Sequence, residues 1–196
     1  MNSLTPIFTF LLAILVFKHQ FSWKQLIGII LGFIGVLCIF FSKNDGHIDF
    51  PLLFGFMIIL ATLFYAISAN TVSHFLKEEN PIVISMVSFL LIGPFVTVYL
   101  LNSGFLEQLQ THEHGYTSFG ALLILSIVGT FGANILFFKL IQITNAVFST
   151  TVSFLIPFVA LFWGFLDGEQ FSIFHILALI LILGGIFLIK YQRPKA

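Results

Sequence analysis

Uncharged apolar stretches, each about as long as a membrane is thick, recur along almost the whole chain. A transmembrane helix needs about 20 consecutive, mostly apolar residues, because the hydrocarbon core of a bilayer is about 30 Å thick. The sequence meets this requirement repeatedly, and the charged residues fall between the stretches. We predict seven membrane-spanning helices, over residues 4–17, 25–42, 51–72, 82–101, 119–138, 147–166 and 173–189.

The composition explains why these stretches belong in lipid. Hydrophobic residues make up 59% of the 196 residues and charged residues only 8%, whereas a soluble domain carries about 25% charged residues. A soluble globule of this size would leave too much of that apolar surface in water. Within lipid, backbone groups must pair inside each segment, which favours helices. We therefore expect an all-α integral membrane protein, a bundle of about seven transmembrane helices.

The basic residues between the expected spans predict the orientation of the chain. If the spans alternate in direction, one side of the membrane receives seven basic residues and the other receives Lys43 alone. The seven are Lys18, Lys24, Lys77, Lys139, Lys190, Arg193 and Lys195. Because cytoplasmic loops carry an excess of lysine and arginine, we expect a multi-pass protein of the cytoplasmic membrane. Its C-terminus would be cytoplasmic and the N-terminus of this chain external.

An internal repeat relates the two ends of the chain. At a constant offset of 150 residues, the matching pairs are Gln20/Gln170, Phe21/Phe171, Ser22/Ser172, Ile30/Ile180, Leu31/Leu181, Gly35/Gly185 and Ile39/Ile189. Upstream, the small or polar stripe Ser149, Ser153, Pro157, Ala160, Gly164 resembles Asn2, Pro6, Thr9, Ala13. Each related pair of spans is separated by five positions in the order of spans. Because five is an odd number, the two members cross the membrane in opposite directions, and the repeat is inverted. Inverted repeats are a recurring architecture of secondary transporters.

The repeat predicts how the chain divides. Residues 51–190 would form one complete five-helix repeat, and residues 1–42 the last two helices of an earlier one. Residues 43–50 would link the two parts, and residues 191–196 would be a cytoplasmic tail. On this interpretation the fold is an inverted-repeat transporter that lacks its first three helices, from a protein of ten spans. The alternative is a natural seven-span protein with a short first helix.

Several local patterns, in their order along the chain, resemble the EamA-type drug/metabolite transporter family of the DMT superfamily. They are Ala61 with Tyr65-Ala66, Pro157-Phe158-Val159-Ala160, Gly168-Glu169-Gln170-Phe171 and Gly184-Gly185. The resemblance implies ten spans in two EamA repeats with both termini cytoplasmic, and this chain would supply spans four to ten. Two features depart from the family pattern: the first three spans are absent, and His19 stands where Glu169 stands in the later repeat.

Uncharged polar residues near the middle of the expected spans are the candidate substrate-binding residues. None of these spans contains Asp, Glu, Lys or Arg, which argues against a charged coupling site within them. The candidates are Thr62, Tyr65, Ser126, Thr130, Ser149, Ser153 and Pro157. The alternative for each hydroxyl is a hydrogen bond to its own helix or to a neighbouring helix. We expect no catalytic residues and no cofactor. The single cysteine, Cys38, suggests no metal site.

These observations favour a secondary transporter, with export as the expected direction. Its substrates would be small organic metabolites, amino-acid-like compounds or drugs, carried by alternating access. The expected partners are the lipid bilayer, the substrate, and either the missing N-terminal helices or a second copy; nucleic acid is not expected. A seven-span receptor or sensor, which fits an external N-terminus, and a non-functional transporter fragment remain alternatives. An intramembrane enzyme would need paired catalytic groups, and no such pair lies within a span.

Overall fold

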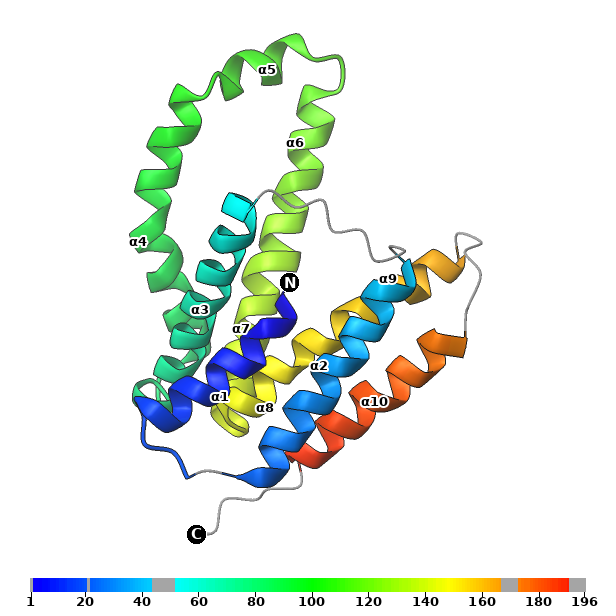
Figure 1. Ribbon diagram of the computed structural model, residues 1–196. Helices are drawn as coiled ribbons and strands as arrows, with labels where there is room; N and C mark the ends of the chain where they lie inside the picture. The colour runs from blue at the N-terminus through cyan, green and yellow to red at the C-terminus, as the bar shows by residue number, and fades with distance from the viewer. Residues whose placement is uncertain (1, 21, 44–51, 167–172, 191–196) are drawn as a thin grey trace. The chain divides into compact units, whose positions relative to one another are not determined.

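The computed structural model describes residues 2–20, 22–43, 52–166 and 173–190, and all regular structure in these ranges is helical (Figure 1). In chain order the elements are η1 (Asn2–Leu4), α1 (Thr5–Leu15), α2 (Trp23–Lys43), α3 (Leu52–Phe75), α4 (Pro81–Asn102), α5 (Phe105–Thr111), α6 (Gly115–Ile124), η2 (Leu125–Gly132), α7 (Ala133–Ile143), α8 (Ala146–Thr150), η3 (Thr151–Leu155), α9 (Ile156–Leu166) and α10 (Ile173–Lys190). Most of the predicted linker, the predicted tail and the motif Gly168-Glu169-Gln170-Phe171 lie outside the described residues.

Each of the seven predicted spans corresponds to a helix or to a continuous helical run. Four runs are long and apolar enough to cross a membrane: Phe54–Phe75, Pro81–Asn102, Gly115–Ile143 and Ala146–Gly164. Three shorter apolar helices cover Thr5–Leu15, Trp23–Ile39 and His175–Ile189. The expectation of an all-helical, multi-pass membrane bundle is therefore confirmed.

The fifth span differs from its predicted bounds. It runs from Gly115 to Ile143, so Lys139 lies inside α7 rather than in the following loop. A lysine is tolerated near a helix end because its methylene stem can carry the ammonium toward the membrane surface. The helix ends just before Asn145, whose side chain caps the next helix. The connection before this span also contains the short helix α5, which was not expected.

The sixth span changes its helical type where the sequence places a proline. The run begins as α8, tightens to a 3₁₀ helix in η3 and continues as α9. Pro157 lacks an N–H and its ring crowds the carbonyl of the residue four positions earlier, Ser153. This conflict gives a physical reason for the 3₁₀ geometry directly before Pro157.

The chain forms two compact units. The first contains residues 1–75 and 144–196, and the second contains residues 76–143. The core of the first unit is apolar and is contributed by α1, α2, α8, η3, α9 and α10. Its buried members are Phe10, Ala13, Ile29, Ile39, Val147, Phe154, Leu161, Ala178, Ile182 and Ile189.

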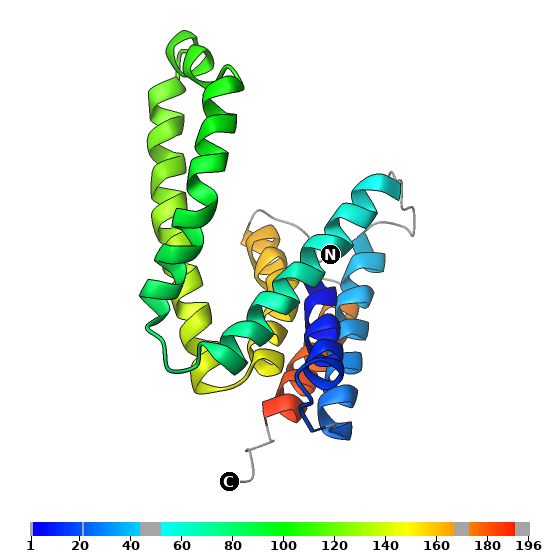
Figure 2. The ribbon, with the colours of Figure 1, turned by 90° about the vertical axis from the view of Figure 1, so that its left-hand side faces the viewer.

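Glycines allow α2 and α10 to pack against each other within the first unit (Figures 1 and 2). A Cβ atom added to Gly28 would lie 2.6 Å from the carbonyl oxygen of Gly185, and one added to Gly35 would lie 2.8 Å from that of Ala178. Gly35, later in α2, therefore meets an earlier residue of α10 than Gly28 does, so the two helices are antiparallel. Small residues at such crossings let backbones approach closely in a membrane.

The contacts in this helix pair are reciprocal under the 150-residue offset. Gly28 corresponds to Ala178, and Gly35 corresponds to Gly185. The contact of Gly28 with Gly185 therefore has its counterpart in the contact of Gly35 with Ala178. If α2 and α10 are exchanged under the 150-residue offset, each of these contacts becomes the other. An antiparallel helix pair with this symmetry is the geometry expected of an inverted repeat.

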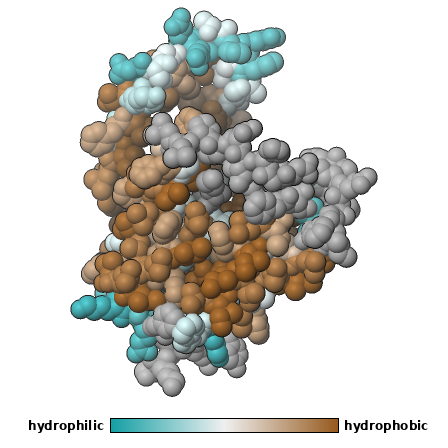
Figure 3. Space-filling view, in the orientation of Figure 1, coloured by the Kyte–Doolittle hydropathy of each residue, from teal (hydrophilic) through white to brown (hydrophobic). Residues whose placement is uncertain are grey.

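The second unit is a long helical hairpin with an apolar surface. Figure 2 shows α4 and α6 side by side, joined by α5 at one end. Rings pack between its two arms, with Phe89 and Phe131 at a centroid distance of 6.0 Å. Large apolar side chains remain outside, and Phe95 is 79% exposed. Hydrophobic colour covers these helices and hydrophilic residues gather at the α5 end (Figure 3), as expected for a hairpin whose sides contact lipid.

Candidate functional site

Five of the seven predicted site residues lie in the first unit. Thr62 and Tyr65 are on α3, Ser149 is on α8, Ser153 is in η3 and Pro157 is on α9. Thr62 and Ser149 are buried, at 3% and 0% exposed, whereas Tyr65 is 47% exposed. Ser153 and Pro157 are half-buried, one turn apart on the same run.

The hydroxyls of these residues donate hydrogen bonds to their own helices. The Oγ1 of Thr62 donates to Ile59 O at 2.7 Å, and the Oγ of Ser153 donates to Thr150 O at 2.8 Å. The Oγ of Ser149 donates to Asn145 O at 2.9 Å and lies 3.0 Å from the Oγ1 of Thr144. Each hydroxyl oxygen keeps acceptor capacity after donating, so these residues can still accept a hydrogen bond from a substrate.

Ser126 and Thr130 form a separate group in the second unit. Both lie in η2, a π-helical segment, and both are exposed. The Oγ of Ser126 donates to Leu122 O at 2.8 Å. π-Helical turns inside α-helices are rare and are frequent at functional sites, so this segment keeps its place among the candidates.

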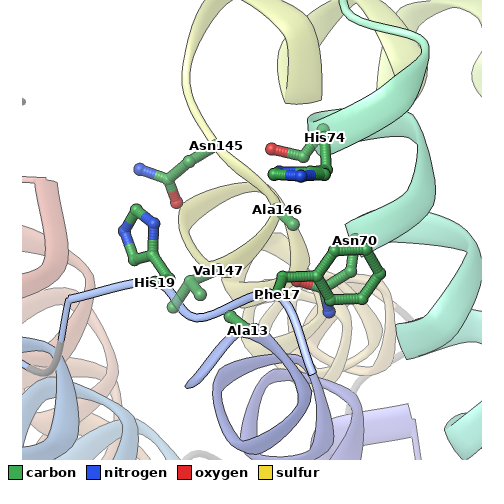
Figure 4. A pocket seen from close by; sticks show the side chains of 9 residues that line it. Ala13, Phe17, His19, Asn70, His74, Asn145, Ala146 and Val147 are labelled. Atoms are coloured by element: carbon green, nitrogen blue, oxygen red, sulfur yellow. The ribbon is translucent and has the colours of Figure 1, made fainter. Parts of the chain in front are cut away.

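The structure brings together a polar pocket in the first unit that was not predicted from the sequence. Its volume is about 50 Å³ (Figure 4). It is lined by Ala13, Phe17, His19, Asn70, Ser73, His74, Asn145, Ala146 and Val147. The lining comes from the end of α1 and the turn after it, from the last part of α3, and from the start of α8.

Backbone and ring contacts hold the walls of this pocket. Asn70 is 4% exposed, and its Nδ2 donates to Thr9 O at 3.1 Å and to Ala66 O at 2.9 Å, which ties α3 to α1. The Oδ1 of Asn145 accepts from the backbone N–H of Phe148 at 2.8 Å and so caps α8. Such a cap satisfies one of the unpaired donors at a helix start.

A turned backbone brings His19 back to the end of α1. Lys18 has a φ of 51°, in the left-handed region, and the backbone N–H of His19 donates to Ala13 O at 2.8 Å. The Phe17 ring meets the His74 ring edge-on at a centroid distance of 5.5 Å. Figure 4 shows the His19 ring beside Asn145 and Val147, with the His74 ring on the other side of Ala146.

The pocket residues left one signal in the sequence. His19, Asn70, His74 and Asn145 all lie near span ends on the lysine-rich side of the predicted topology. Sequence reasoning noted His19 only as a departure from a family pattern. The convergence of these residues depends on how α1, α3 and α8 pack, which spacing along the chain does not reveal.

The chemistry of the pocket is that of imidazoles, amides and a hydroxyl. None of its lining residues is Asp, Glu, Lys or Arg. Among the residues that the structure describes, no three His, Cys, Asp or Glu side chains come together as metal ligands. The arrangement can donate and accept hydrogen bonds to a small polar group.

The comparison with known families agrees with the helical architecture. The profile of the EamA-like transporter family matches residues 1–41 and 53–191, which together are nearly the whole chain. The chain belongs to the EamA-like transporter family. The resemblance expected from the patterns around Tyr65, Pro157 and Gly185 is thereby confirmed. Residues 42–52, which include the predicted linker 43–50, lie between the two matched segments of this EamA-like protein.

A curated relative extends the comparison along almost the full length of this EamA-like chain. The protein is similar to the Uncharacterized transporter YoaV of Bacillus subtilis (strain 168), with 28% identity over 194 residues. The alignment covers 97% of this chain but 65% of the relative, so the chain spans less than two thirds of the relative's length. No solved structure matches the chain.

Proposed function

We propose that this EamA-like protein provides the substrate pathway of a secondary transporter. The substrates are small organic metabolites, amino-acid-like compounds or drugs, and the transport is export across the cytoplasmic membrane by alternating access. The observation that carries the proposal is the family match over residues 1–41 and 53–191. Membership in a transporter family favours this function over the receptor and enzyme alternatives.

The polar residues within the membrane helices support an uncharged or zwitterionic substrate. In the first unit, the buried or half-buried hydroxyls at Thr62, Ser149 and Ser153 belong to helical runs that consist mostly of apolar residues. Binding sites for small organic molecules are mostly apolar, with a few placed polar groups that fix orientation. The candidate set comprises Thr62, Tyr65, Ser126, Thr130, Ser149, Ser153 and Pro157.

The proposed orientation follows from the basic residues. Lys18 and Lys77 would face the cytoplasm, because they belong to the side that holds seven of the eight basic residues. Glu113, in the connection between α5 and α6, would face the outside. The pocket near His19 and His74 would then open toward the cytoplasm.

The active transporter is proposed to contain helices beyond those of this chain. The similar relative is longer, since the alignment covers 65% of it. Secondary transporters of this architecture place the substrate between two repeats. Further helices would come from additional N-terminal sequence or from a second copy of the chain.

Transport itself tests the proposal. The chain would be expressed with and without the N-terminal helices of the similar relative, and membrane insertion would be confirmed for each form. Uptake into inverted vesicles would be measured for a panel of labelled amino acids and organic amines, and resistance of intact cells to toxic analogues would be scored. We expect accumulation of at least one compound in inverted vesicles. No change for any compound, with the protein present in the membrane, would contradict the proposal.

A further inference from the structure

The pocket near His19 and His74 is the place where polar side chains from three parts of the first unit converge. Asn70, Ser73 and His74 come from α3, His19 follows α1, and Asn145 precedes α8. These residues line one shared space, although Asn70 and Asn145 also bond nearby backbone groups. They were not among the predicted substrate-binding residues, so the pocket raises a separate question about its ligand.

The side chains that line the pocket indicate which class of ligand it suits. Its lining contains two imidazoles, two amides and a serine, and no carboxylate. A cationic ligand would find no carboxylate among these lining residues. Imidazole, amide and hydroxyl groups can all donate hydrogen bonds to the oxygens of an anion. The hydrogen-bond donors of the lining and the absence of a carboxylate therefore favour an anionic group.

The donors of the pocket fit the oxygens of such a group. The Oδ1 of Asn145 is used as the cap of α8, so the amide nitrogen is the donor that this side chain offers. His19 and His74 are both exposed enough to be reached from outside the protein. The Ser73 hydroxyl supplies a further donor at the pocket wall.

The size of the pocket restricts the anion. A volume of about 50 Å³ accommodates a few atoms, given that a site for one water molecule needs at least about 10–15 Å³ on this kind of measure. A carboxylate has three heavy atoms and is planar. The remainder of an amino acid would extend through the mouth of the pocket.

We propose that this pocket binds the carboxylate of a small zwitterionic amino acid. The binding of a carboxylate does not depend on the proposed function. Only the role of the pocket does: in the transporter, the pocket would be the cytoplasmic access site for carboxylate-bearing substrates. Binding itself can be measured without transport, so the two proposals can fail separately.

Histidine NMR provides the direct test. The purified full chain would be placed in phosphatidylcholine nanodiscs with labelled histidines, and sodium acetate would be titrated at constant ionic strength. We expect saturable shifts of the His19 and His74 ring signals at millimolar acetate, assigned through the His19→Gln and His74→Gln variants. His112 and His114, in the connection between α5 and α6, should not respond. Equal shifts with acetamide or with chloride would overturn the proposal.

A variant that fills the pocket separates binding from folding. Ser73→Leu places a bulky apolar side chain in the pocket and keeps both imidazoles, so acetate affinity should fall at least about tenfold, or 1.4 kcal/mol. The matched control is Thr71→Val, which changes a hydroxyl on the same helix that bonds Ile67 O and does not line the pocket. An unchanged acetate response in Ser73→Leu would overturn the proposal.

A lipid headgroup is the other possible source of an anion. The titration would be repeated in nanodiscs that contain phosphatidylglycerol. Acetate shifts that persist there support a carboxylate site. Loss of the acetate response, with His19 and His74 already shifted by the lipid, would assign the pocket to a phosphate headgroup and overturn the proposal.

Discussion

Gly28 and Gly185 meet backbone to backbone where α2 crosses α10. A Cβ atom at Gly28 would lie 2.6 Å from the Gly185 carbonyl oxygen, and a Cβ atom at Gly185 would lie 2.9 Å from the backbone nitrogen of Gly32. Real Cβ atoms do not approach other atoms so closely, so neither helix has room for a side chain. Close packing of this kind replaces the hydrophobic effect, which does not drive helices together in lipid.

Replacement of Gly185 by alanine should force α2 and α10 apart. The atoms in the way are backbone atoms of Gly28 and Gly32, which cannot rotate aside. We expect the free energy of unfolding to fall by about 1–3 kcal/mol, the usual cost of overpacking. This loss would be measured as a lower thermal unfolding midpoint in detergent. Gly184→Ala is the matched control, because its Cβ would meet nothing within 4 Å. Equal midpoints for the two variants would contradict the close crossing.

Replacement of Asn70 by leucine should loosen the contact between α1 and α3. The Asn70 Nδ2 bonds Thr9 O on α1 and Ala66 O on its own helix, and a leucine of similar size removes both bonds, of which only the first links the two helices. Hydrogen bonds between membrane helices are worth about 0.6 kcal/mol on average and up to about 1.7 kcal/mol, so we expect a destabilisation in that range. Thr71→Val, which removes a bond within α3 alone, serves as the control in the same unfolding assay. A larger loss in the control would show that the link to Thr9 is unimportant.

Replacement of Gln142 by leucine should release the turn before α4. The buried Gln142 Nε2 donates to Leu76 O at 2.9 Å and to Glu79 O at 2.7 Å, within the second unit. Without these bonds, opening of the turn should become easier by about 1.4 kcal/mol, and amide exchange at residues 77–80 should be about tenfold faster. Gln110→Ala, at an exposed position on α5, should leave this exchange unchanged. Exchange at wild-type rates in the Gln142 variant would refute the assignment.

Replacement of Ser153 by leucine should lower transport if the proposed substrate path is right. Ser153 is half-buried and lies one turn before Pro157, so a bulky side chain would fill space beside the candidate hydroxyls. We expect transport to fall at least about tenfold, because a blocked site loses substrate contacts as well as space, with expression unchanged. The control is Val152→Leu, at an exposed neighbouring position. Unchanged transport in the Ser153 variant would remove that residue from the site.

Cysteine labelling should place Lys77 and Glu113 on opposite sides of the membrane. Both positions are exposed in connections between helices, and the native Cys38 would first be replaced by alanine. An impermeant thiol reagent added to intact cells should label Glu113→Cys, and Lys77→Cys should react only after the membrane is opened. Labelling of both from outside would contradict the orientation derived from the basic residues.

The membrane helices could be found from the sequence because their main requirement is local. A span needs enough consecutive apolar residues to cross the hydrocarbon, and this property does not depend on neighbouring helices. All seven predicted spans appear as helical runs. The end of the fifth span was misplaced, because one lysine at position 139 was read as a boundary, although its stem can reach the membrane surface from within a helix.

The candidate site divides differently between sequence and structure. The hydroxyls at Thr62, Ser149 and Ser153 were recognisable from their position in apolar spans, and their role stays a prediction. The pocket residues His19, Asn70 and His74 gave no comparable signal, because each is an ordinary polar residue near a span end. Only the packing of α1, α3 and α8 makes them neighbours.

The sequence by itself determined that the helices belong in a lipid bilayer, where the seven apolar helical runs lie, and which family the chain belongs to. These properties depend on the length of apolar stretches and on local patterns, which can be read from each segment alone. Tertiary structure alone decided which small residues meet and which polar groups share a pocket. Gly28 meets Gly185, and His19 lines the same pocket as Asn145, although each pair is more than 100 positions apart in the chain. Contacts at that separation depend on how helices pack against each other. Helix packing is determined by the surfaces of two helices together, so it cannot be read from the sequence of either helix alone.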